Sequence, residues 1–231
     1  MKQQKIAAAA VAALALGGLA ACSDSGDASD GASGGKQESV TVLVHDSFNV
    51  PLDLIYKFEK ESGYSLTTTA PGDAGVVVNQ LILAQDNPTV DAVFGVENFS
   101  VQKAVDAGVF APYTSDALPA SGADYTLDGA VTPSDQGDVC VNVDHAWFKD
   151  QGVAEPASFE DLAKPEYAKL LVVEDPAASS PGLAFLVGTI EAMCEDGYQD
   201  YWQSLLDGGT KVDSGWSDAY YTDFSGADGK G

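Results

Sequence analysis

Arginine is absent from this chain of 231 residues, and all eleven of its basic residues are lysines. Nucleic-acid binding depends on basic patches, and phosphate groups are most often held bidentately by guanidinium groups. The 35 acidic residues give a formal net charge of −24. This composition argues against DNA, RNA and nucleoside triphosphates as partners. An acidic surface attracts cationic ligands, although the charge also serves simply to keep a protein soluble.

Histidine and cysteine are scarce as well, with two histidines and three cysteines in the chain. His45 and His145 are too few for a zinc site, so we expect neither a metal nor another cofactor. Cys140 and Cys194 follow the leader segment and would lie in an oxidising compartment. Either they form a disulfide, or they are two separately buried thiols.

The first 38 residues read as an export signal and a tether. Two lysines and then an Ala/Leu/Val-rich run make residues 1–21 a signal peptide, too short for a transmembrane span. The segment Leu19-Ala20-Ala21-Cys22 resembles the lipobox of bacterial lipoproteins, which implies that Cys22 is diacylated. Residues 22–38 are rich in Ser, Gly and Asp and predict a flexible linker. The protein is therefore expected outside the cytoplasm, lipid-anchored to the outer face of the cytoplasmic membrane.

Residues 39–131 alternate between strand and helix patterns and form a predicted first lobe. Runs rich in β-branched residues predict strands, and each is followed by a helical pattern; the strands are expected at 40–44, 64–69 and 91–96. This alternation is typical of an α/β fold with a mainly parallel sheet, whose ligands bind beyond the carboxyl ends of the strands. The polar clusters at His45 to Phe48, Asp73 and Glu97 fall at such ends.

Residues 132–231 form a predicted second lobe, entered through the Pro/Gly/Ser/Asp-rich stretch 112–137. Strands are expected at 139–143, 170–173 and 210–213. A capping box at Ser158 predicts a short helix. Ser179 or Ser180, before Pro181, caps a helix over 183–193, and the free amides there favour a polar or anionic ligand group.

The stretch 214–221, with the sequence SGWSDAYY, follows the last predicted strand. Its aromatic rings, hydroxyls and carboxylate suit a wall that holds a flat cation. The alternative is an amphipathic turn of helix whose aromatic residues face a core.

Several segments taken together, in order, resemble the thiamine-binding lipoproteins of ABC importers. These segments are 45–48 (HDSF), 72–75 (GDAG), 91–98 (DAVFGVEN), 137–142 (GDVCVN), 175–182 (DPAASSPG) and 215–220 (GWSDAY). The resemblance implies a two-lobed type II periplasmic-binding-protein fold that closes on thiamine or its phosphates. It also implies a monomer that delivers its ligand to a permease and an ATPase.

The resemblance also implies roles for particular residues. Asp73 and Ala74, with His45 beside them, would contact the ligand from lobe one, and Ser179 and Trp216 would hold its hydroxyethyl or phosphate end. With the strand-end, cap and aromatic residues, the predicted ligand site is His45, Asp73, Ala74, Glu97, Ser179, Ser180, Trp216 and Tyr220.

The chain departs from the family pattern in three ways. Glu97 stands where Asp is usual, and the expected Tyr is missing at Gln136 and Val143. Family members also continue beyond residue 231, so we expect the second lobe and the return to the first lobe to be incomplete.

Two other functions fit parts of the pattern. The same fold could bind a ferric ion or a polyamine, and Tyr220-Tyr221 superficially suits iron. The segment Gly215-Trp216-Ser217-Asp218-Ala219 is one residue from a nucleophile elbow, with His145 as a candidate base. Because the histidine precedes the serine and Asp218 stands where an oxyanion amide is needed, we expect no catalytic residues and no enzyme.

Overall fold

A computed structural model describes residues 38–227 of this chain. The predicted signal peptide, Cys22 and residues 22–37 of the predicted linker lie outside the described residues. The chain divides into the units Met1–Lys36 and Gln37–Gly231, and the described residues all belong to the second. Among the helices of residues 38–227, none has the length and apolar character needed to cross a membrane.

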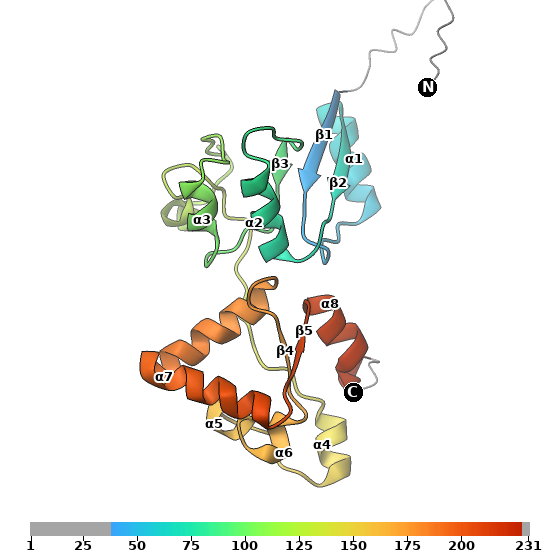
Figure 1. The fold of residues 1–231 in the computed structure, drawn as a ribbon. Helices are drawn as coiled ribbons and strands as arrows, with labels where there is room; N and C mark the ends of the chain where they lie inside the picture. Colours follow the sequence, from blue (N-terminus) through green and yellow to red (C-terminus); the bar gives the residue numbers. More distant parts are fainter. Residues whose placement is uncertain (1–37, 228–231) are drawn as a thin grey trace, which may run out of the picture. The chain divides into compact units, whose positions relative to one another are not determined.

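The first part of the chain forms a parallel sheet, here called the N-terminal sheet (Figure 1). Its strands are β1 (Glu38–Leu43), β2 (Tyr64–Thr69) and β3 (Ala92–Val93), in the order β2-β1-β3. Val40 pairs with Leu66 and Val42 with Ala92, and both pairings are parallel. The predicted parallel α/β arrangement is therefore confirmed here, although β3 is shorter than the predicted strand 91–96.

Three helices follow the strands of this sheet: α1 (Leu52–Ser62), α2 (Ala74–Leu83) and α3 (Val101–Asp106). Gly63 ends α1 in the left-handed conformation, with φ 78°. Helix α2 begins directly after Asp73, whose side chain caps it by accepting the Ala74 N–H.

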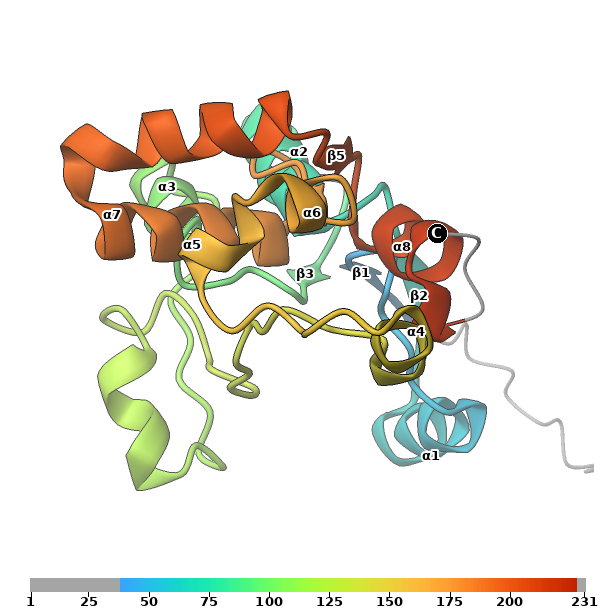
Figure 2. The same cartoon turned by 90° about the horizontal axis from the view of Figure 1, so that it is seen from below.

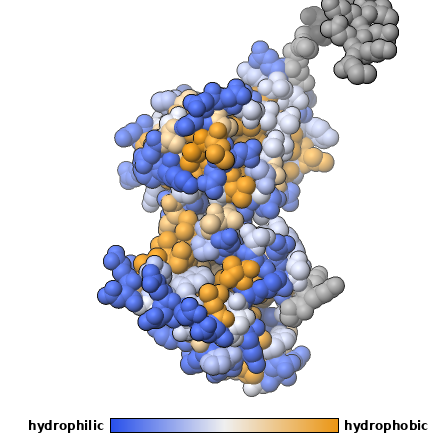
Figure 3. Space-filling model, in the orientation of Figure 1, coloured by the Kyte–Doolittle hydropathy of each residue, from blue (hydrophilic) through white to orange (hydrophobic). Residues whose placement is uncertain are grey.

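The apolar residues of α1 lie at the surface. Leu52, Leu54, Tyr56 and Phe58 are 43–65% exposed, and α1 has no buried residue. Figure 3 shows apolar residues at the surface where Figure 1 places α1.

The second part of the chain forms a two-stranded parallel sheet, here called the C-terminal sheet. Its strands are β4 (Val172–Glu174) and β5 (Lys211–Asp213), with Val173 opposite Val212. Besides α7, described below, the remaining helical elements are short: η1 (Ala120–Tyr125), α4 (His145–Gln151), α5 (Phe159–Leu162), α6 (Pro165–Ala168), α8 (Trp216–Asp218), η2 (Ala219–Asp223) and η3 (Ser225–Ala227).

The predicted strand at 139–143 does not form. This segment belongs to no helix or strand, and Val139 and Val141 are 52% and 44% exposed. An apolar run becomes a strand only where a neighbouring strand supplies hydrogen bonds and cover, and residues 139–143 pair with neither sheet.

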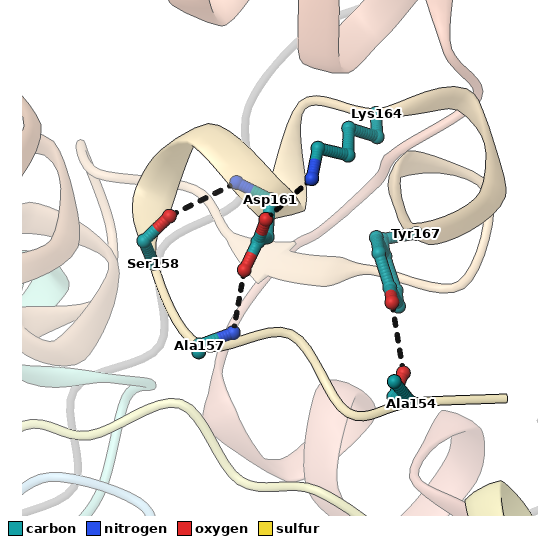
Figure 4. Close-up of polar contacts among 6 residues, drawn as sticks. All are labelled: Ala154, Ala157, Ser158, Asp161, Lys164 and Tyr167. Atoms are coloured by element: carbon teal, nitrogen blue, oxygen red, sulfur yellow. Dashed lines mark hydrogen bonds and ion pairs between the residues drawn. The ribbon is translucent and has the colours of Figure 1, made fainter.

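The start of α5 confirms the predicted cap at Ser158 (Figure 4). The Asp161 N–H donates to Ser158 Oγ at 3.2 Å, and Asp161 Oδ2 accepts the Ala157 N–H at 2.9 Å. Lys164 Nζ pairs with Asp161 Oδ1 at 2.6 Å. Tyr167, on α6, donates its hydroxyl to the Ala154 carbonyl at 2.8 Å, which ties the preceding loop to that helix.

Helix α7 (Ser180–Asp207) is two arms joined by a sharp bend, visible in Figure 1 and Figure 2. Cys194 has φ 61° and ψ 168° at the bend, so the helical hydrogen-bond ladder is interrupted there. Trp202 Nε1 on the second arm donates to Thr189 Oγ1 on the first at 2.9 Å. The two arms close over α5, where Leu162, Tyr201 and Leu205 form the buried core.

Candidate functional site

Asp73 joins the ends of the two sheets. Its Oδ1 accepts the Ala74 N–H at 2.9 Å, and its Oδ2 accepts the backbone N–H of Trp216 at 3.1 Å. Asp73 is only 9% exposed. Gly215 allows the close approach, since a Cβ there would lie 3.2 Å from Asp73 Oδ2. One carboxylate thus caps α2 and holds the start of α8.

Gly75 makes a second link between the sheets. Its N–H donates to the Ala178 carbonyl at 2.8 Å. A Cβ on residue 75 would lie 2.6 Å from the Ala177 oxygen and 2.7 Å from the Ala178 oxygen, and both of these atoms are backbone. Residue 75 must therefore be glycine for α2 to lie this close to the loop before α7.

Ser179 caps α7 from a fully buried position. It is 1% exposed, and its hydroxyl accepts the Gly182 N–H at 3.5 Å and donates to the Glu174 carboxylate. A Cβ at Gly182 would lie 2.4 Å from the Glu174 carbonyl oxygen, so glycine lets the helix start against the end of β4. This confirms Ser179 as the cap and leaves Ser180 as the first helical residue.

Glu174 is a partly buried carboxyl in this junction. Burial raises the pKa of Glu174, the Ser179 hydrogen bond opposes that effect, and the negative charges of Asp73 and Asp213 add to the rise. Desolvation and the repulsion between neighbouring carboxylates both make it costly for all of these carboxyl groups to be ionised at once. The site is therefore electronegative and sensitive to protonation at Glu174.

Lys211 compensates part of this charge from β5. Its Nζ pairs with Asp213 Oδ1 at 2.7 Å and also with Asp223 on η2. These two hydrogen bonds raise the pKa of Lys211, so the ammonium stays charged. Asp213 is 6% exposed and its Oδ2 has no partner among the described residues, and burial raises the pKa of Asp213.

Two small cavities flank the contact between the sheets. The first, about 210 Å³, is lined by residues of α2, α3, the loop after β3 and the start of α7, among them Glu97, Ser179 and Ser180. The second, about 270 Å³, is lined by the loop 46–49 together with Trp216, Ser217 and Tyr221. Each is smaller than a pocket that encloses a drug-sized ligand, about 300–1,000 Å³. The Asp73 and Gly75 contacts lie at this junction.

The structure gathers most of the predicted site residues around these cavities. Asp73 and Trp216 touch each other, and Glu97, Ser179 and Ser180 share one cavity. Ala74 is buried beside Asp73. Their roles toward a ligand stay predictions.

Four of the predicted site residues are not among the residues that line either cavity: Asp73, Ala74, His45 and Tyr220. The His45 ring packs 5.9 Å from the Phe94 ring, and a Cβ at Gly95 would come within 2.4 Å of it. Tyr220 stacks on Trp216 at 4.8 Å between ring centroids, with the planes 10° apart. Part of the Trp216 ring is therefore already occupied by another ring of the same helical turn.

Several cavity residues were missed by the sequence reasoning. Lys103 lines the first cavity, and its Nζ donates to Asn79 Oδ1 at 2.8 Å. Asn79 lies on α2 and Lys103 on α3, and neither stands in a motif. The predicted strand-end cluster is His45 to Phe48, and of these only His45 is a predicted site residue, whereas residues 46–48 are the ones that line the second cavity. The loop 46–49 lies near Trp216 through a tertiary contact between distant parts of the chain, which no local sequence pattern shows.

The arrangement gives no support to a catalytic serine. Ser217 lines the second cavity, but the Nδ1 atom of the proposed base His145 bonds Glu155 Oε1 at 2.6 Å on a largely exposed side chain. That hydrogen bond raises the pKa of His145 and favours the imidazolium, which is not a base. In residues 38–227, no group of three or more His, Cys, Asp and Glu side chains is placed to hold a metal ion.

The two cysteines differ from both predicted alternatives. Cys140 and Cys194 are free thiols and both are exposed, so they form neither a disulfide nor a pair of buried thiols. Cys140 lies in the segment that fails to become a strand, and Cys194 lies at the bend of α7. The local structure that would have buried each of them is absent at these two positions.

Comparison with known families and sequences gives a consistent result. A family described as bacterial extracellular solute-binding proteins matches residues 87–228. The thiamine-binding periplasmic protein of Brucella suis is 27% identical over 188 residues, which is 80% of this chain and 55% of that protein. The thiamine-binding periplasmic protein of Escherichia coli is 29% identical over 187 residues, or 78% and 55%. The chain thus spans about half the length of the curated relatives it matches.

Solved structures share the fold. A periplasmic thiamin binding protein superposes with a TM-score of 0.62 at 24% identity, covering 81% of this chain and 59% of that one. A ferric binding protein from Campylobacter jejuni gives a TM-score of 0.53 at 19% identity, with 81% and 59% covered.

Proposed function

Since this chain belongs to the bacterial extracellular solute-binding proteins and has their α/β type II periplasmic-binding fold, we propose that it captures thiamine, or a thiamine phosphate, between its two sheets. The names of its relatives in Brucella suis and Escherichia coli support thiamine as the ligand. Residues 39–131 form one lobe in this proposal and residues 132–231 the other.

The contact between Asp73 and Trp216 carries the proposal. It brings a buried carboxylate of one sheet to a polar, aromatic turn of the other, with a cavity on either side. Thiamine has a permanently charged thiazolium ring, which a carboxylate balances without proton transfer. A net charge of −24 favours the approach of such a cation.

The remaining predicted residues take supporting roles in this proposal. Ser179 and Ser180 receive the hydroxyethyl or phosphate end, and Glu97 adds a carboxylate to the same cavity. Ala74 and His45 complete the wall beside Asp73, and Tyr220 holds the Trp216 ring in place through the stacked contact.

The protein acts as a carrier in this proposal and not as an enzyme. It is exported through residues 1–21, tethered to the membrane by lipid on Cys22, and works as a monomer outside the cytoplasm. It passes its ligand to the permease and ATPase of an ABC importer.

Calorimetric titration of thiamine into the purified chain tests the proposal. We expect saturable heat with one site per chain, and no heat from a sample that is folded by circular dichroism would refute it. Ferric citrate and spermidine are titrated in parallel. A coloured one-to-one iron complex, with no heat of binding from thiamine, would favour an iron carrier. A heat of binding from spermidine alone would favour a polyamine carrier.

A further inference from the structure

The Ser179 hydroxyl has a single proton, and Glu174 determines where that proton points. Ser179 Oγ donates to the Glu174 carboxylate and accepts the long contact from the Gly182 N–H. A serine hydroxyl is one donor and offers two lone pairs. While Glu174 is ionised, the Ser179 hydroxyl therefore offers a ligand in the first cavity only a lone pair of Oγ and no proton.

Protonation of Glu174 reverses this arrangement. A neutral Glu174 carries its own O–H, which donates to Ser179 Oγ, and the Ser179 proton is then free to point into the cavity. An alcohol can donate to an acceptor, but the oxygens of an ionised phosphate ester only accept hydrogen bonds. The two protonation states thus suit different ligand ends.

We propose that Glu174 is a specificity-determining residue, which orients the Ser179 hydroxyl so that this end of the site takes an alcohol in preference to a phosphate ester. The inference rests on the proposed function, because it concerns the hydroxyethyl end of thiamine. Glu174 acts through Ser179 and is a positioning residue, since Ser179 lines the cavity and Glu174 is not among its lining residues.

The acidic groups around Glu174 act on this discrimination through its protonation, because they favour the neutral form, which suits a phosphate ester. Asp73 faces it from the start of α2 and Asp213 from β5, and both raise the pKa of Glu174. Asp213 is in turn paired with Lys211, which also holds Asp223. The neighbouring Asp175 accepts the Ala177 N–H at 2.9 Å within its own turn.

One cation in the cavity favours a phosphate ester directly. Lys103, bonded to Asn79, is a cation that attracts a phosphate. Its contribution is the same with glutamate or glutamine at position 174. The change in the affinity ratio between the wild type and Glu174→Gln therefore reports on Glu174. The absolute affinity for a phosphate ester does not, because it also includes the attraction of Lys103.

The test compares thiamine and thiamine monophosphate in calorimetric titrations of the wild-type chain and Glu174→Gln. The NH2 group of glutamine can donate to Ser179 Oγ, which an ionised carboxylate cannot do, and this leaves the Ser179 proton free to point into the cavity. We expect the affinity ratio to shift toward the monophosphate by about tenfold, the size of one hydrogen bond to a charged group. Glu191→Gln, an exposed change on α7 that removes the same charge, should leave the ratio unchanged.

Two further measurements separate the hydroxyl from a general loss of charge. In a Ser179→Ala background, Glu174→Gln should shift the ratio by much less, because the hydroxyl that it reorients is gone. As the pH falls through the raised pKa of Glu174, wild-type selectivity should move toward the monophosphate more steeply than that of Glu174→Gln. The second ionisation of the ester, near pH 6, contributes equally to both variants.

The outcomes distinguish the two proposals. Thiamine binding with the same ratio in the wild type and Glu174→Gln, or an equal shift with Glu191→Gln, overturns the role of Glu174 and leaves the carrier function standing. A folded wild-type chain that binds neither compound overturns the proposed function and this inference with it.

Discussion

Replacing Gly75 with alanine should weaken thiamine binding while α2 stays folded. The added Cβ would lie 2.6 Å from the Ala177 oxygen, against an ordinary contact distance of 3.4 Å, so the two chains must separate by about 0.8 Å. Both of the crowded atoms are backbone, and no side-chain rotation can relieve the contact. The strain falls on the junction between the two sheets.

The expected magnitude follows from the contacts that this separation breaks. The Gly75 N–H bond to Ala178 contributes about 1 kcal/mol, and the Trp216 N–H bond to the Asp73 carboxylate about 1.5 kcal/mol or more. Losing most of both is worth about 2 kcal/mol, or about thirtyfold in affinity. Alanine is intrinsically the better helix former by up to about 1 kcal/mol, so stability should hold.

Thiamine titrations of Gly75→Ala and Gly188→Ala check this expectation. A Cβ at Gly188, also within a helix, meets only the Phe159 Cζ at an ordinary 3.6 Å, and this variant should bind like the wild type. Circular dichroism and urea unfolding establish that both variants are folded. Wild-type affinity in a folded Gly75→Ala chain would refute the reasoning that the sheets must close at this glycine.

Three further predictions concern stability and the thiols. Tyr201→Phe should leave the free energy of unfolding in urea unchanged or raise it by about 1 kcal/mol, because the buried hydroxyl has no partner among the described residues; a loss of more than about 1 kcal/mol would contradict this. The raised pKa of Glu174 means that the folded state holds its proton more tightly than the unfolded chain. Its stabilising contribution is complete below the ordinary value of 4.5 and is lost as pH rises through the folded-state pKa, so the stability of the wild type relative to Glu174→Gln should fall over that range. If the stability of the wild type relative to Glu174→Gln rises with pH instead, the pKa of Glu174 is not raised in the folded state and the prediction is wrong. Iodoacetamide should label the peptides of both Cys140 and Cys194 in the native, unreduced protein, and a disulfide-linked peptide would disprove the free thiols.

Local chemistry made much of the fold predictable from the sequence. The β-branched run at 40–44 gave β1, the glycine at position 63 ended α1, and the serines at 158 and 179 capped their helices, because each pattern acts within a few residues. The ends of parallel strands share one edge of a sheet, so the positions of Asp73 and Glu97 in the site region also followed from the pattern.

The remaining features depend on contacts that no local pattern encodes. Val139 and Val141 look like a strand, but no partner strand reaches them. The bend at Cys194 brings Trp202 on one arm of α7 against Thr189 on the other, a contact between residues 13 positions apart. Trp216 meets Asp73 through its backbone N–H, and this contact does not follow from the identity of its side chain. Lys103 enters the first cavity only because α3 lies beside α2.

The most direct test of the central claim compares thiamine affinity in Asp73→Asn and Asp86→Asn by calorimetry. Asparagine at 73 keeps a cap for α2 but removes the charge at the junction of the sheets, so we expect binding to weaken by about tenfold or more. Asp86, exposed in the turn after α2, removes the same charge elsewhere and should leave the affinity within about twofold of the wild type. Equal affinities in the two variants, with both chains folded, would contradict a thiamine site at Asp73.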